Sequence, residues 1–240
     1  EQARAIVLVD AFDDPHNLTN NGQSDQILDS ANGIPDEILR DQRDVNFTET
    51  GSAGDTVAGN DPGVGDEILT LDPGGLGDSA TVTLNYDDND GDPGLNTAGF
   101  GTTGNGVDFL EGSNNNGLKF RVFNPTSQAE LSVTLHANGG TDNISIPNFQ
   151  LDPNDIASPN NNLFFGFTSG GDDTFDPGGT QGFDFADISA VQIELTSTSN
   201  AVGIEAFGAV PDAETDLDAR ESTAVPFEAE HSVGFGFLLA

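Results

Sequence analysis

Short runs in which apolar and polar residues alternate recur along this chain of 240 residues, and such alternation predicts β-strands. In the clearest three runs every second residue is apolar: residues 80–86, 131–136 and 191–196. Clusters of Gly, Pro, Asn and Asp separate the runs, which is typical of antiparallel strands joined by turns. The pattern predicts further strands at residues 6–12, 45–50, 67–71, 106–111, 118–124, 143–146, 163–168 and 202–207.

Helical periodicity is limited to two short segments, at residues 36–44 and 184–189. No repeat of fixed period is found along the chain, which argues against a solenoid or a propeller. Many short strands with long loops rich in Asp, Gly and Asn favour two packed antiparallel sheets. The fold class predicted is therefore all-β, as a single jelly-roll-like antiparallel β-sandwich with a C-terminal extension strand.

The sandwich is expected to occupy residues 1–210, followed by an acidic linker at residues 211–230 and an apolar strand at residues 231–240. That last segment is shorter than the roughly 20 apolar residues that a membrane-spanning helix needs, so no membrane span is predicted. As a strand it would complete the sheet of its own chain or add to a neighbour's sheet. One of its faces would carry Val233, Phe235, Phe237 and Leu239.

The residues that precede this apolar segment form a short motif, Pro226, Phe227 and Glu228, and a Gly-interrupted apolar run follows at residues 233–240. The arrangement resembles the C-terminal sorting signal of exported bacterial surface proteins of the PEP-CTERM type, in the Pro-Phe-Glu variant met in cyanobacteria. Phe227 stands where the strict motif has Glu, and the basic cluster of the family is missing. The resemblance implies a secreted or cell-surface location and a surface or matrix role, without implying an activity.

Acidic residues outnumber basic residues by 41 to 6, which gives a formal net charge of −35. Nucleic acid and anionic membrane surfaces are therefore expected to be poor partners, because phosphate binding needs a basic face. A charge of this size repels itself unless salt or bound cations screen it. Together with the many Asn residues, it favours an extracellular protein that meets divalent cations. The chain has no cysteine, so disulfides and thiol chemistry are excluded.

An acidic loop follows the run at residues 80–86, and its alternating carboxylates offer the hard oxygen ligands that calcium prefers. It is not an EF-hand, because Pro93 stands where the turn glycine is expected and Gly99 where a glutamate is expected. The alternative is a solvated, Asp-rich turn. The candidate calcium ligands are Asp87, Asp88, Asp90 and Asp92, with a second candidate site at Asp172, Asp173 and Asp176.

No catalytic motif is found, and we predict that the chain is not an enzyme. The histidines His16, His136 and His231 lack metal-ligand spacing, and no nucleophile elbow, phosphate loop or dinucleotide fingerprint occurs. The 41 acidic residues would place some pair at the separation that a glycosidase requires in any fold, so that separation carries no information.

The function predicted from these observations is that of an extracellular structural protein, a subunit of a surface filament or matrix layer. Copies would associate by strand complementation, so the main partner would be a second copy of the chain. The basic pair Lys119 and Arg121 would meet an acidic surface of that copy or, alternatively, pair with neighbouring acids. The other predicted subunit contacts are the four tail residues above and Ile6 and Leu8 of the N-terminal strand. The alternative function is a secreted carbohydrate-binding or adhesive module that recognises surface glycans.

Overall fold

The computed structural model describes the chain at residues 6–10, 12, 17–18, 22–28, 42–50, 56–58, 68–75, 77–87, 92–100, 106–112, 114–154, 156, 162–212 and 217. Of residues 8, 17, 25–28 and 56–58 the backbone alone is described. No helix in this part of the chain is long and apolar enough to cross a membrane.

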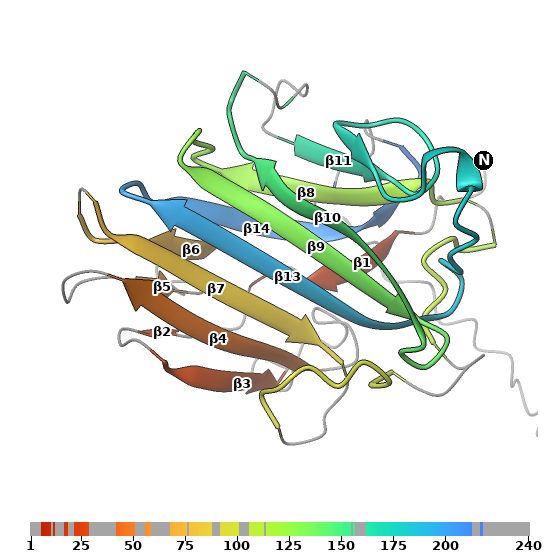
Figure 1. Ribbon diagram of the computed structural model, residues 1–240, viewed down its shortest axis with the longest axis horizontal. Helices are drawn as coiled ribbons and strands as arrows, with labels where there is room; N and C mark the ends of the chain where they lie inside the picture. The colour runs from red at the N-terminus through yellow and green to blue at the C-terminus, as the bar shows by residue number, and fades with distance from the viewer. Residues whose placement is uncertain are drawn as a thin grey trace, which may run out of the picture.

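The described strands form two sheets that pack face to face (Figure 1). The first sheet is antiparallel throughout. Its six strands, in spatial order, are β10 (Asp142–Gln150), β9 (Ala129–Ala137), β13 (Ile188–Thr198), β7 (Ser79–Tyr86), β4 (Gln42–Thr50) and β3 (Ser24–Leu28).

The second sheet has eight strands and is antiparallel except for the two strands at one edge, which pair with each other in parallel. Strand β14 of this sheet pairs with two strands, β6 and β1, each of which contacts a different half of it. The order is β12 (Asp173–Thr174), β11 (Asn162–Gly166), β8 (Gly117–Phe123), β14 (Val202–Val210), β6 (Leu69–Asp72), β5 (Thr56–Ala58) and β2 (Asn17–Leu18), with β1 (Val7–Asp10) beside β14.

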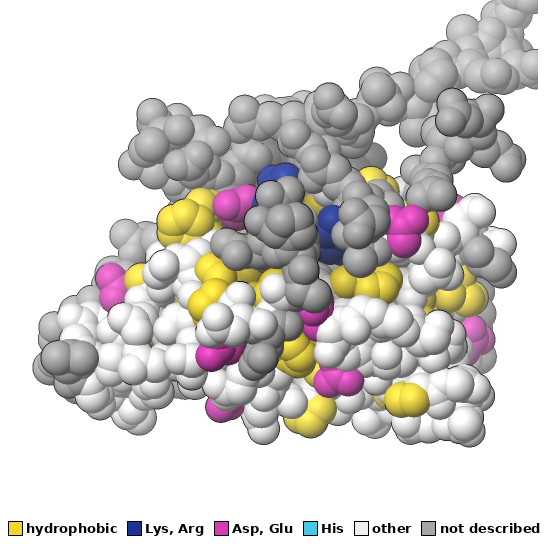
Figure 2. All heavy atoms as spheres, turned by 90° about the horizontal axis from the view of Figure 1, so that it is seen from above, with side chains coloured by type: hydrophobic (Ala, Val, Ile, Leu, Met, Phe, Trp, Pro, Cys, Tyr) yellow, Lys and Arg dark blue, Asp and Glu magenta, His cyan; other side chains and the backbone are white. Residues whose placement is uncertain are grey.

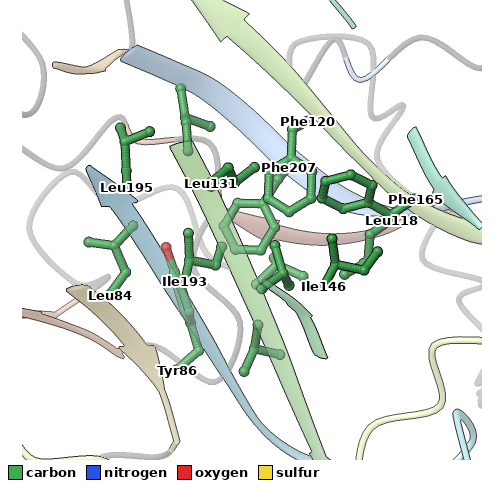
Figure 3. Close-up of a cluster of buried hydrophobic side chains, with 14 of the residues drawn as sticks. Leu84, Tyr86, Leu118, Phe120, Leu131, Ile146, Phe165, Ile193, Leu195 and Phe207 are labelled. Atoms are coloured by element: carbon green, nitrogen blue, oxygen red, sulfur yellow. The ribbon is translucent and has the colours of Figure 1, made fainter. Parts of the chain in front are cut away.

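The core lies between the two sheets and is built from the residues that alternate inward along each strand (Figure 3). In β9 every second residue from Ala129 to Ala137 is buried, as a strand with one covered face requires. Phe207 stands at the centre, because it stacks on Phe120 at 5.2 Å and meets Tyr86 edge-on at 5.3 Å. Full burial of each such side chain contributes about 1.5–3 kcal/mol to stability.

The predicted all-β sandwich is confirmed, and the three clearest runs lie within β7, β9 and β13. The finer prediction of a jelly roll stays a prediction. The helix predicted at residues 184–189 is wrong: the Asp184 carboxylate instead accepts the Ala186 N–H at 3.0 Å in a turn, and β13 begins at Ile188. The helix predicted at residues 36–44 is also wrong where it is described, because residues 42–44 belong to β4.

The strand predicted at residues 106–111 is wrong as well. Val107 forms an isolated bridge with Ile188, and the chain then turns. The turn is held by the two carboxylate oxygens of Asp108, which accept the N–H groups of Leu110 and Gly112 at 2.9 and 3.1 Å. Strand β14 ends at Val210, and the predicted division into sandwich, linker and tail stays a prediction. Leu217, inside the predicted linker, is buried against Phe164 and Val210.

Aspartate side chains close many of the loops by accepting backbone N–H groups. The Asp72 and Asp92 carboxylates, for example, accept the N–H two residues later at 2.9 and 3.0 Å. The buried Asp187 carboxylate accepts the Gly106 N–H at 2.7 Å and so ties two segments far apart in the sequence. Hydrogen bonds to a charged acceptor are stronger than neutral ones. Further acceptors of this kind are Asp87, Asp152, Asp172, Asp173 and Asp176.

A buried ion pair joins the two sheets. Arg43 Nη1 of β4 lies 2.5 Å from Asp10 Oδ2 of β1, and neither side chain is exposed. The Tyr86 hydroxyl donates to the same oxygen at 2.7 Å, and the Phe12 N–H donates to Oδ1 at 2.7 Å. Burial raises the pKa of Asp10, while the charge of Arg43 and these hydrogen bonds oppose that rise. Burial and the charge of Asp10 raise the pKa of Tyr86 well above its usual value.

The variant Arg43→Met is expected to lower the free energy of unfolding by about 3–5 kcal/mol, because it leaves the Asp10 carboxylate buried without its counter-charge. The double variant Asp10→Asn/Arg43→Met should lose less, since the amide oxygen at position 10 can still accept the Phe12 N–H while the amide NH2 donates to the Tyr86 hydroxyl oxygen. Chemical denaturation of the two single variants and the double variant measures the coupling. Strictly additive losses would contradict a coupled buried pair.

Candidate functional site

The outward side of the six-stranded sheet carries a broad surface of uncharged polar side chains. The sheet is the near layer in Figure 1. Of the twelve outward residues on its three central strands, nine have a hydroxyl or an amide, two are carboxylates and none is Lys or Arg. We call these residues the polar face: Glu130, Ser132, Thr134 and His136 of β9, Gln192, Glu194, Thr196 and Thr198 of β13, and Ser79, Thr81, Thr83 and Asn85 of β7.

The strand register arranges the polar face in rows that run across the sheet. Thr134, Gln192 and Asn85 are direct neighbours on three adjacent strands. Glu130, Thr196 and Thr81 form a parallel row, which Thr48 of β4 extends. Adjacent strands lie about 4.8 Å apart, so each row places hydrogen-bonding groups at that spacing, and Asn85 is the buried end of its row. The face therefore offers a repeating array of donors and acceptors.

Hydrogen bonds between neighbours hold the polar face in place. The Thr81 and Thr196 hydroxyls are 2.9 Å apart, and Gln192 Nε2 donates to Asn85 Oδ1 at 2.9 Å. At one end of the face, Asn85 and Asn46 both donate to the Pro93 carbonyl, at 3.3 and 2.9 Å. These bonds set the side-chain positions before any partner arrives, which lowers the entropy lost on binding.

The polar face carries no positive charge near neutral pH. Partial burial lowers the pKa of His136, so its imidazole is neutral there. The basic residues that the structure describes lie elsewhere: Arg43 is in the core, and Lys119 and Arg121 belong to β8 of the other sheet. In the view of Figure 2, carboxylates are scattered over the described surface and do not gather into one patch.

The structure describes two of the four residues of the first predicted calcium site. Asp87 is buried and accepts the Asn96 N–H, whereas Asp92 is exposed and accepts the Gly94 N–H. The loop folds closely over Asp87, because a Cβ added to Gly99 would lie 1.6 Å from the Asp87 carbonyl oxygen. Asp88 and Asp90 lie outside the described residues.

In the second candidate site each carboxylate accepts a different backbone N–H. Asp172 accepts from Phe164 at 2.8 Å, and Asp173 accepts from Thr174 at 2.7 Å. Asp176 accepts from Gln181 and Gly182 at 3.0 and 3.2 Å, and the Gln181 N–H lowers the pKa of Asp176. Among the described residues, no group of three or more His, Asp or Glu side chains is arranged to hold a metal ion. Calcium binding stays a prediction.

The predicted subunit contacts are dispersed. Ile6 is 40% exposed, and the strand that contains Leu8 pairs with β14 of the same chain, with Leu8 opposite Gly208. Arg121 Nε lies 3.4 Å from Glu205 Oε2, which matches the alternative of an ion pair with a neighbouring acid, and Lys119 is buried. The tail residues Val233, Phe235, Phe237 and Leu239 lie outside the described residues.

Sequence reasoning missed the polar face, because alternating polar residues are ordinarily taken as a solvated side of a sheet. The usable signal was the residue type at the outward positions. Thr, Ser, Asn and Gln fill most of them, whereas a surface selected for solubility carries more Lys, Arg, Glu and Asp.

Comparison with known proteins adds little to this geometry. No family model matches the chain, and no curated protein matches it. A solved structure described as "Structure of PfGH50B" is similar with a TM-score of 0.35 and 13% sequence identity. The match covers 70% of this chain and 22% of that one, so this chain spans about a fifth of that protein's length. A similarity of this size carries no argument about function.

The variants Thr81→Val and Thr196→Val test the cross-strand hydroxyl pair. Each single change should lower the free energy of unfolding by about 0.5–1.5 kcal/mol, because it leaves one hydroxyl without its partner. The double variant should be close to the wild type, since two apolar groups of the same shape then face each other. Thermal denaturation checks this, and a double variant as unstable as the sum of the singles would contradict the pairing.

Proposed function

We propose that this chain is a secreted or cell-surface β-sandwich that binds a neutral polysaccharide through its polar face. The observation that carries the proposal is the composition of that face, nine hydroxyl or amide side chains out of twelve and no Lys or Arg. The resemblance of residues 226–228 and 233–240 to an export-sorting signal supports the location.

Sugar hydroxyls are neutral groups that both donate and accept hydrogen bonds. Thr, Ser, Asn and Gln side chains have the same dual capacity, so they complement a polysaccharide without any charge. An anionic polysaccharide is disfavoured, because Glu130 and Glu194 lie on the face and the whole chain carries a formal charge of −35. The partner proposed is therefore uncharged.

The strength of such binding depends on the number of contacts. The twelve residues of the face include no Phe, Tyr or Trp ring on which a sugar could stack. Each hydrogen bond contributes only about 0.5–1.5 kcal/mol net. A polymer that crosses several rows makes many of these bonds at once and gains from multivalency. Isolated sugars should consequently bind weakly to the face, whereas long chains should be retained.

Sedimentation with insoluble cellulose, xylan and starch tests the proposal, with alginate as the anionic control. We expect at least one neutral polymer to retain the protein, with little change between low and high salt, because no ion pair is involved. The variant Thr81→Val/Thr83→Val/Thr134→Val/Thr196→Val should bind at least about tenfold more weakly, since it removes four hydroxyls.

Thr70→Val is the matched control, because Thr70 belongs to β6 of the opposite sheet. It should bind as the wild type does. Failure of every neutral polymer to retain the protein, or retention that the quadruple variant leaves unchanged, would reject the proposed function.

A second candidate function is assembly into a surface filament by strand complementation. The observation that favours it is the open edge at β10, which pairs with β9 alone among the described strands. The register of β10 shifts between Ile146 and Phe149, and Pro147 has no N–H to donate. The stretch that a donor strand would use is thus Asp142 to Ile146.

Deletion of residues 231–240 is expected to abolish polymers that electron microscopy detects for the full chain, because the apolar donor segment is then gone. A variant with Ser in place of Phe235 and Phe237 should have the same effect at unchanged length. Polymers of the same appearance from the truncated chain would exclude C-terminal strand exchange.

A further inference from the structure

A groove of about 230 Å³ lies at the margin of the polar face. One wall is the start of β10, where Asn143 is the direct neighbour of His136 of the polar face. The other wall comes from the loop that leads to β13, about 40 residues further along the chain. The groove is lined by Thr141, Asp142, Asn143 and Ile144 and by residues 181–183.

The groove combines one aromatic ring with several neutral polar groups. Phe183 is half-buried, while Asp142, Asn143 and Gln181 are exposed. An aromatic ring gives an apolar surface on which the C–H groups of a sugar ring can pack, and amides and a carboxylate bind its hydroxyls. The lining includes no Lys or Arg, so an anionic ligand has no counter-charge there.

The loop wall is held in place by residues that do not line the groove. The Asp176 carboxylate accepts the N–H groups of Gln181 and Gly182 at 3.0 and 3.2 Å. The Phe183 ring meets Phe185 edge-on at 4.9 Å, and Phe185 packs against Phe167 at 4.4 Å. Asp176 is therefore a positioning residue, because it holds the segment that carries Gln181 and Phe183 without lining the groove itself.

The strand wall is fixed by its own turn. Asn138 Nδ2 donates to Asp142 Oδ2 at 2.6 Å, and the Thr141 hydroxyl donates to the Asn138 carbonyl at 3.1 Å. Because hydrogen bonds within the fold hold both walls, a ligand loses little binding energy to their ordering. The volume is below the roughly 300–1,000 Å³ of pockets for drug-sized ligands, which suits a single sugar ring.

We propose that this groove binds one sugar residue of a neutral glycan, with the ring packed on Phe183 and its hydroxyls bonded to Asp142, Asn143 and Gln181. The inference rests on the proposed function and adds a specificity-determining subsite to it. The polar face would retain the polymer, and the groove would select which sugar is accepted at a chain end or branch beside β10.

Titration of the isotope-labelled protein with maltotriose, cellotriose and xylotriose, followed by NMR, tests the subsite. We expect one trisaccharide to shift the amide signals of residues 141–144 and 181–183. Phe183→Leu, which keeps an apolar side chain without the ring, and Asn143→Ala/Gln181→Ala should each weaken binding about tenfold. Asn154→Ala, at an exposed position away from the groove, should leave it unchanged.

A pair of variants, one at Asp176 and one at a nearby control position, tests the positioning role of Asp176. Asp176→Asn should weaken trisaccharide binding and shift the signals of residues 180–183 in the free protein. Asp173→Asn, which alters a nearby carboxylate that accepts only a local N–H, should do neither. Equal binding by the Asp176 variant would show that the loop needs no such anchor and would overturn that part of the inference.

The outcomes separate the two proposals. Polymer retention without any shift at residues 141–144 and 181–183 overturns the groove and leaves the polar face standing. Groove shifts without polymer retention support the groove and reject the face. If neither a polymer nor a trisaccharide binds, both proposals fail. Polymer retention that survives the groove variants, with trisaccharide binding lost, supports the division of roles.

Discussion

The shortage of cations is the constraint on which the rest of the structure depends. With 41 acidic side chains and 6 basic ones, most carboxylates have no basic side chain available to pair with. In the described loops the aspartates instead accept backbone N–H groups, as Asp108 and Asp176 do with two each. The acidity that separates this sequence from an ordinary sandwich is thus part of how its loops are closed.

Arg43, one of two buried cations in the described part of the chain, has a different task. Arg43 pairs with Asp10 across the space between the sheets, and the Tyr86 hydroxyl completes the arrangement. Arg43 Cζ also lies 5.0 Å from the centre of the Phe12 ring, which adds an attraction between the cation and the ring face. These contacts connect β1 to β4 and β7, so a short N-terminal strand is joined to the larger body of the fold.

The alternation of apolar and polar residues made β7, β9 and β13 predictable, because their inward residues are all hydrophobic or small. It failed at residues 36–44, where Ile38 and Leu39 among charged residues suggested a short helix, whereas β4 begins at Gln42 and buries the charged Arg43 and Asp44. The same alternation gave each strand a polar side. Which residues of the three strands lie side by side depends on the strand register, which the pattern along one strand does not predict. The groove could not be predicted from the sequence, since it lies between the start of β10 and a loop about 40 residues further along the chain.

The hydrogen bonds between aspartate carboxylates and backbone N–H groups also bear on how the fold responds to salt concentration. An ion pair at a surface weakens as dissolved salt rises, because mobile ions screen it within about 10 Å at moderate ionic strength. An N–H group carries only a partial charge, so salt screens its bond to a carboxylate, such as that of Asp172 at 2.8 Å, less than it screens a pair of full charges. We therefore expect rising salinity to act mainly on the repulsion between surface charges and only weakly on loops closed in this manner.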